Sequence, residues 1–238
     1  MVHAAPEEAR QFKAPPPFWR TISLRCVDRD VTARVCDNVH DFTVTLSHEQ
    51  GLVTRVAARA DRIPWTTCPA AIERLQQLVG LALTARVNQT VDQSHQCTHM
   101  LDLAKLALRQ AQRGGQRTYA VATEATEQPD TCVSRITRDG EEVCLWQISG
   151  NTIDSPALFR GLTVTGRASW PPEVERDPDL YEAALILRRS LVVFRGRRHV
   201  TERVRRAIDL NHMKGACLTF TEAYVNVAVR PANFVDLK

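Results

Sequence analysis

The sequence predicts an α+β protein in which an antiparallel sheet packs against two or more helices. Short, alternating, β-branched runs fill the N-terminal quarter, the apolar period then changes from two to about 3.6 after Pro69, and β-like runs return after Gly115. The chain thus predicts strands, then helices, then strands and helices again. This order is typical of an α+β fold and not of a doubly wound parallel sheet. The 238 residues, 44% of them hydrophobic, suffice to bury a core without staples.

The first seventeen residues show no apolar periodicity and end in Pro15-Pro16-Pro17. We therefore expect residues 1–17 to form a flexible tail and residues 18–238 to form a single α+β domain, beginning at the aromatic pair Phe18-Trp19. The pattern leaves open whether residues 116–238 make a second lobe.

Four runs after this tail predict a meander of antiparallel strands, at residues 21–27, 31–36, 41–47 and 52–60. The last two runs are separated by Glu49-Gln50-Gly51, which predicts a tight hairpin turn at Gly51.

Two helices are expected next, and each follows a cysteine. Residues 69–79 begin directly after Cys68 and stop at Gly80, where a left-handed C-terminal residue fits. Residues 98–112 begin directly after Cys97, with Thr98 as the expected N-cap, and stop at Gly114.

The C-terminal half predicts strands at 118–123, 132–137, 143–148 and 162–165, with an Asp139-Gly140 turn between the second and the third. A helix opens at Asp177-Pro178, and its continuation over 185–194 fits either a helix or a buried strand. A short helix near 200–208 and a closing strand at 217–229 complete the expectation. No internal sequence repeat is detectable.

Composition narrows the class of protein. Seven cysteines form an odd set in a chain too large to need disulfides, and the N-terminus lacks the apolar core of a signal peptide, so we expect a cytoplasmic protein. The longest apolar candidate, residues 180–194, is interrupted by Arg188 and Arg189, which argues against a membrane span. A net charge of +4 is low for a nucleic-acid module.

The candidate active site lies where the two helices begin. Helix N-termini favour thiolates, so Cys68 and Cys97 could each act as an activated thiol. If both N-termini open onto one cavity, Cys97 or His99 would serve as nucleophile or general base, with His99 oriented by Asp102 or a neighbour.

The same residues allow a second interpretation. Cys36, Cys68, Cys97 and His99 could bind zinc or an iron–sulfur cluster, whereas buried cysteines that only pack would need no cofactor at all. Asp37 and His40 lie in a further group, which could add a ligand, orient an imidazole, or only reverse the chain.

A basic stripe supplies a third candidate. Arginines are dense between residues 188 and 206, and Arg195, Arg197 and Arg198 are the candidates for holding an anionic cofactor or partner. A solvated helix face that pairs with the acidic stretch 173–179 is the alternative.

Two family resemblances follow from these motifs. Arg62-Ile63-Pro64, Cys68, Gly80, and Cys97-Thr98-His99-Met100 with Asp102-Leu103 resemble domain of unknown function 2889, a family of uncharacterised bacterial proteins, over residues 20–112. The family's usual glycine and leucine around Cys-Thr-His are Gln96 and Met100 here. The order of Cys36, Cys68 and Cys97 is also similar to that of iron–sulfur cluster assembly scaffold proteins, a weaker likeness that implies kinship of fold.

We therefore expect a bacterial cytosolic protein that binds a small-molecule ligand, as an enzyme or a binding protein with a Cys/His site. The alternatives are a metal, iron–sulfur or thiol carrier, and a binding module for an anionic partner. We expect neither a nucleic acid nor a membrane as partner, and a homodimer is left open.

Overall fold

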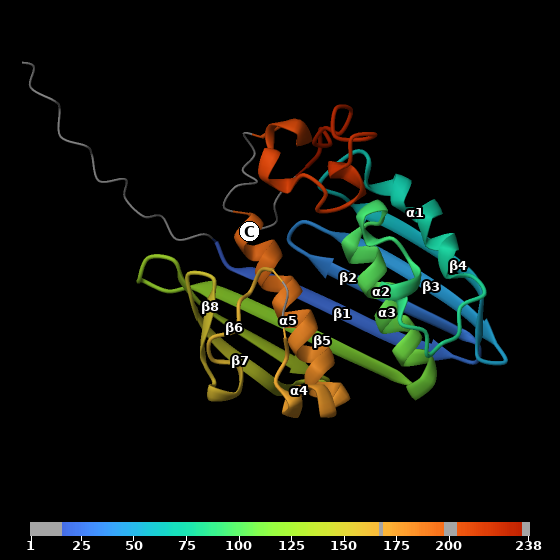
Figure 1. Ribbon diagram of the computed structural model, residues 1–238, viewed down its shortest axis with the longest axis horizontal. Coiled ribbons are helices and arrows are strands. Elements are labelled where there is room, and N and C mark those ends of the chain that lie inside the picture. Colours follow the sequence, from blue (N-terminus) through green and yellow to red (C-terminus); the bar gives the residue numbers. More distant parts are fainter. Residues whose placement is uncertain (1–15, 167–168, 198–203, 235–238) are drawn as a thin grey trace, which may run out of the picture.

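Eight strands form one antiparallel sheet in the computed structural model, which describes residues 16–166, 169–197 and 204–234. The order across the sheet is β4-β3-β2-β1-β5-β6-β7-β8 (Figure 1). The predicted fold class is confirmed, since several helices pack against this antiparallel sheet. The strand bounds are β1 (Phe18–Val27), β2 (Asp30–Asp37), β3 (Asp41–Glu49), β4 (Leu52–Arg62), β5 (Gln116–Ala125), β6 (Thr131–Arg138), β7 (Glu141–Ser149) and β8 (Thr152–Ser155).

The four predicted N-terminal strands are present, each slightly longer than expected. Their side chains alternate between a buried and a more exposed face, as in β1, where Phe18, Ile22 and Leu24 point into the core. The hairpin between β3 and β4 turns at Gln50 and Gly51, which both have positive φ (50° and 79°). This is the two-residue turn that matches the twist of paired strands.

The helical region after β4 differs in detail from the expectation. The predicted helix 69–79 is a succession of short pieces, namely η1 (Cys68–Ala70), α1 (Ala71–Arg74) and η2 (Leu75–Leu78). It is followed by α2 (Val87–Thr90), η3 (Gln93–His95) and the long α3 (Thr98–Arg113), which confirms the predicted helix 98–112. The N-cap of α3 is Cys97 and not Thr98, and no side chain caps that end.

The second half repeats the pattern of strands and then a helix. The Asp139-Gly140 turn is confirmed by positive φ at both residues. The expected strand 162–165 is wrong: the fourth strand is β8, and Thr163 makes only an isolated bridge to Thr152. After η4 (Ala157–Phe159) and α4 (Pro172–Arg176), the ambiguous run 185–194 lies within α5 (Pro178–Gly196), whose N-cap is Asp177.

The expected closing strand 217–229 is also wrong. That segment forms η7 (Leu218–Phe220) and turns, with one isolated bridge between Arg206 and Val229, and it follows η5 (Ala207–Asp209) and η6 (Asn211–Met213). Leu218, Thr219 and Phe220 are all buried, and three consecutive buried side chains do not fit the two-residue period of a strand at a sheet edge. Residues 200–203 of the expected short helix lie outside the described residues.

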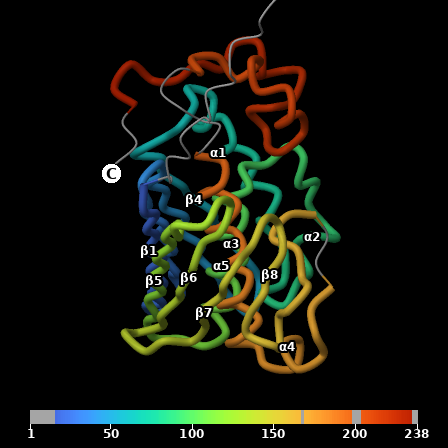
Figure 2. Tube along the Cα trace, turned by 90° about the vertical axis from the view of Figure 1, so that its left-hand side faces the viewer, coloured from blue at the N-terminus to red at the C-terminus, as the bar shows by residue number. Residues whose placement is uncertain are grey.

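The two halves of the fold share one topology although their sequences do not repeat. Each supplies four antiparallel strands followed by a helix, and the two sets meet at the antiparallel β1–β5 pair. A rotation of 180° about an axis perpendicular to the sheet, between β1 and β5, would superpose the order β1 to β4 on the order β5 to β8. Helix α3 packs on β1, β2 and β3, and α5 packs on β5, β6 and β7, on the same side of the sheet (Figures 1 and 2).

This arrangement places the core between one sheet face and the two long helices. Large side chains that are fully buried there come from both halves, such as Phe42, Tyr119, Trp146 and Phe194. None of the helices in the part of the chain that the structure describes combines the length and the apolar character that crossing a membrane requires.

Candidate functional site

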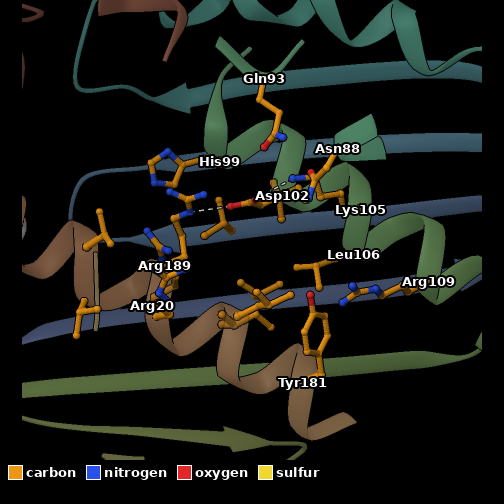
Figure 3. A pocket seen from close by; sticks show the side chains of 18 of the residues that line it. Arg20, Asn88, Gln93, His99, Asp102, Lys105, Leu106, Arg109, Tyr181 and Arg189 are labelled. Atoms are coloured by element: carbon orange, nitrogen blue, oxygen red, sulfur yellow. Dashed lines mark hydrogen bonds and ion pairs between the residues drawn. The ribbon is translucent and has the colours of Figure 1, made fainter. Parts of the chain in front are cut away.

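A cavity of about 450 Å³ lies between α3 and α5, over strand β1 (Figure 3). Its apolar walls come from β1, β2, α3 and α5, and include Ile22, Val35, Leu103, Leu106, Leu185, Ile186 and Val192. Its polar walls, among the described residues, hold five basic side chains and a single carboxylate: Arg20, Lys105, Arg109, Arg188, Arg189 and Asp102. A concave apolar pocket with a few convergent polar groups is the usual form of a small-molecule site.

A buried ion pair supports one end of the cavity. Arg20 and Asp37 face each other in the β1–β2 register and both point to the helix side of the sheet. Arg20 donates to Asp37 Oδ2 from Nε (3.0 Å) and Nη2 (2.6 Å). Asp37 Oδ1 accepts from the backbone N–H groups of Val39 and His40, both at 2.7 Å, which shapes the β2–β3 turn.

The Asp37 carboxylate also orients the imidazole of His40, whose Nδ1 lies 3.1 Å from Oδ1. Burial alone would raise the pKa of Asp37, but the interaction with His40 and the positive charge of Arg20 outweigh it and hold that pKa well below its usual value. Two of the three interpretations of this group have geometric support, namely orientation of an imidazole and reversal of the chain.

The imidazole of His99 stacks on that of His40, with ring centroids 4.0 Å apart and planes at 29°. Burial, then the interaction with His40 and the positive charges of Arg20 and Arg189, lower the pKa of His99 well below its ordinary value, so this imidazole is neutral near pH 7. His99 lines the cavity, and its buried Nε2 has no hydrogen-bond partner among the described residues.

Asp102 lies one turn further along α3 but does not orient His99 through a hydrogen bond. It accepts instead from Arg189 Nε at 2.7 Å and from Lys105 Nζ at 3.3 Å. The first of these contacts joins α3 to α5 across the cavity and fixes the plane of the Arg189 guanidinium.

Arg188 and Arg189 occupy the same wall. Burial, and then the charge of Arg189, lower the pKa of Arg188, whose guanidinium donates to the backbone carbonyls of Thr163 and Gly166. The opposite end of the cavity is formed by Arg109 and Tyr181, where the guanidinium lies 5.4 Å from the ring centroid (Figure 3).

The predicted thiols lie outside this cavity. Cys68 and Cys97 are both buried, and they are close enough to each other and to Cys217 for their charges to interact. Burial raises the pKa of Cys68 and raises that of Cys97 to about 12, although two backbone N–H groups at the start of α3 act in the other direction on Cys97. Desolvation therefore outweighs the helix N-terminus, which is opposite to the expected activation of the thiols.

The four proposed metal ligands are not brought together. Cys36 alternates with Val35 and Asp37 along β2, so it faces away from the sheet side on which His99 lies. Within residues 16–166, 169–197 and 204–234, no group of three or more His, Cys, Asp or Glu side chains could hold a metal ion. The predicted zinc or iron–sulfur set Cys36, Cys68, Cys97 and His99 is therefore not assembled.

The basic stripe does not form one surface. Arg188 and Arg189 line the cavity, whereas Arg195 donates to Asn151 Oδ1 at 3.0 Å, and Arg197 donates to the carbonyls of Pro16 and Pro17. Arg198 lies outside the described residues. The acidic stretch also has other partners than those expected, because Asp179 pairs with Arg113, Arg117 and Arg138.

Sequence reasoning missed Arg20 as a site residue. A signal was present, because Arg20 stands between Phe18 and Ile22 on the apolar face of an alternating strand, where a charged side chain requires a buried partner. Asp37 follows Val31, Ala33 and Val35 on the inner face of β2 in the same way.

The fold and the cavity together define an α+β protein with a basic, ligand-sized cavity between two helices. Residues 23–112 match a protein family described as "Protein of unknown function (DUF2889)", which confirms the resemblance to domain of unknown function 2889. This segment runs from within β1 almost to the end of α3, the first of the two topological halves. No curated protein and no solved structure matches the chain, and the likeness to iron–sulfur scaffold proteins gains no support.

Proposed function

We propose that this protein binds a small-molecule anion in the cavity between α3 and α5, as a binding protein or an enzyme. The observation that carries the proposal is the imbalance of charge in the cavity wall, where five basic side chains accompany one carboxylate among the described residues. Guanidinium groups recognise carboxylates and phosphates through paired hydrogen bonds.

The arrangement of two arginines supports an anionic ligand. Arg188 and Arg189 are neighbours in sequence, both line the cavity, and their like charges disfavour each other in a partly desolvated setting. An anion placed beside them would relieve this repulsion. Asp102 only partly offsets it, because its carboxylate is shared between Arg189 and Lys105.

Thermal shift and calorimetry with a panel of organic anions and their neutral analogues would test the proposal. We expect anions to raise the melting temperature and neutral analogues to do so far less. Arg189→Gln should weaken anion binding at least tenfold, whereas Arg55→Gln, which changes an exposed arginine on β4, should leave it unchanged. A panel in which no anion binds, or in which both variants behave alike, would refute the proposal.

An enzymatic version is favoured by one further observation, the buried and unpartnered Nε2 of His99 in the cavity wall. A neutral imidazole beside a bound ligand can serve as general base or hydrogen-bond donor. Mass spectrometry of each bound anion after incubation would detect its conversion. We expect His99→Gln to abolish conversion even at anion concentrations that saturate the variant, and conversion that survives in this variant would exclude His99 as the base.

Cys68 and Cys97 receive no role in this proposal. Their thiols do not line the cavity, and burial raises the pKa of both.

A further inference from the structure

We propose that the ligand is an amphipathic organic acid, with its oxyanion between Arg20 and Arg189 beside His99 and its hydrocarbon body against the apolar walls of α3 and α5. This inference rests on the proposed function and adds to it the chemical class and the orientation of the ligand. The oxyanion can be a carboxylate or a phosphate, since both present the same geometry to a guanidinium edge.

At the His99 end of the cavity, two guanidinium groups are held in place by carboxylates and still have N–H donors available for a ligand. Arg20 is held by Asp37 through Nε and Nη2, and Arg189 is held by Asp102 through Nε. No described residue accepts a hydrogen bond from Nη1 of Arg20 or from either Nη atom of Arg189. These donors are therefore oriented before any ligand arrives, which reduces the entropy that binding costs.

The imidazole of His99 adds a third polar group at the same end. Its Nε2 is buried without a partner in the described structure, while the stack on His40 holds the ring in place. A buried polar atom without a partner is costly, and an oxyanion or hydroxyl of a ligand would satisfy it.

The body of the cavity is apolar. Leu103 and Leu106 of α3 and Leu185 and Ile186 of α5 line it, and Leu106 lies between His99 and Tyr181 in Figure 3. His99 and Leu106 are seven residues apart on α3, which corresponds to about 10 Å along the helix axis. A hydrocarbon body of that length would find these aliphatic side chains along its path.

The far end of the cavity is a weaker anion site than the end at His99. Arg109 lies over the ring of Tyr181 and faces the buried carboxylate of Glu182, with Nη1 3.5 Å from Oε2. That carboxylate lies closer to Arg113, whose Nη1 is 2.8 Å from Oε1, so it offsets the charge of Arg109 only in part. A ligand with anionic groups at both ends would place one of them against Leu106, Tyr181 and this one partly paired arginine, whereas two guanidinium groups converge at the other end. The cavity thus favours an acid that is charged at one end only.

Calorimetry with a series of straight-chain acids, from butanoate to octanoate, measures how the affinity depends on the length of the hydrocarbon body. Each added CH₂ that is buried should tighten binding about fourfold, until the cavity is filled. The matching 1-alkanols should bind more weakly at every length, and octanedioate more weakly than octanoate. Octyl phosphate against octanoate identifies the preferred oxyanion.

Two variants separate the head from the tail. Arg189→Gln should remove the preference for acid over alcohol while keeping the dependence on chain length. Leu185→Asn should reduce the dependence on chain length while keeping the preference for acid. Arg55→Gln serves as the matched control and should change neither.

The failures of the two proposals can be told apart. If compact anions bind but affinity does not rise with chain length, or if octanedioate binds as tightly as octanoate, the amphipathic class is wrong and the anion site stands. If neither acids nor compact anions bind, both proposals fall.

Discussion

Replacement of Asp37 by asparagine tests whether the buried ion pair beneath the cavity holds this part of the fold together. The Asp37 carboxylate is fully buried and accepts from Arg20, from two backbone N–H groups and from His40. Asparagine keeps the shape and one acceptor oxygen, but its NH₂ group donates and therefore opposes the Arg20 guanidinium.

The magnitude follows from what the substitution leaves behind. Arg20 is only 2% exposed, so loss of the Asp37 charge leaves a buried guanidinium without its counter-ion. Breaking a buried pair from one side costs about 3–5 kcal/mol. For a chain of this length, that corresponds to a drop of about 10 °C in melting temperature.

Urea unfolding followed by circular dichroism measures the change in the free energy of unfolding. Asp61→Asn is the matched control, because its pair with Arg59 is exposed at the surface and such pairs contribute at most about 1 kcal/mol. A second variant, Arg20→Met with Asp37→Asn, should recover part of the loss, since it removes the unpaired charge. A loss below about 1 kcal/mol in Asp37→Asn would refute the view that this pair supports the cavity.

Three further results are expected. The folded-state pKa of Asp37 lies below its unfolded value, so its contribution to stability is complete above about pH 4 and disappears as pH falls through the folded pKa. Asp37→Asn should therefore make the free energy of unfolding, measured against pH, fall less steeply on the acid side. Since burial raises the pKa of Cys68 and Cys97, iodoacetamide at about pH 8 should label both only after unfolding, and rapid labelling of the native protein at either thiol would contradict the burial that the structure shows. Tyr119→Phe should cost about 1.5 kcal/mol in urea unfolding, because the Tyr119 hydroxyl donates to the buried carboxylate of Glu182 at 2.8 Å. An unchanged midpoint would mean that the neighbouring arginines satisfy Glu182 without this hydroxyl.

Local pattern was sufficient for most of the secondary structure. The alternation in β1 to β4, the turns at Gly51 and Asp139-Gly140, and the period of α3 are each properties of a few neighbouring residues, and all were predictable. The two strands that were wrongly expected lie at 162–165 and 217–229, where β-like residues pair with a neighbour only through an isolated bridge. A strand is defined by its partner as much as by its own residues.

The candidate site divides in a similar way. The helix start at Cys97-Thr98-His99, the position of Asp102 one turn later, and the density of arginine after residue 188 can all be read along the chain. The environment of each side chain cannot be read from the sequence. Burial raises the pKa of Cys97, whereas the helix N-terminus was expected to lower it. Strand alternation places Cys36 on the opposite side of the sheet from His99. The antiparallel β1–β5 pair places α3 beside α5, so that Arg20 and Arg189 line one cavity. Period and turn chemistry act over a few residues, whereas desolvation and charge pairing depend on atoms that are distant in sequence, and these only the folded chain brings together.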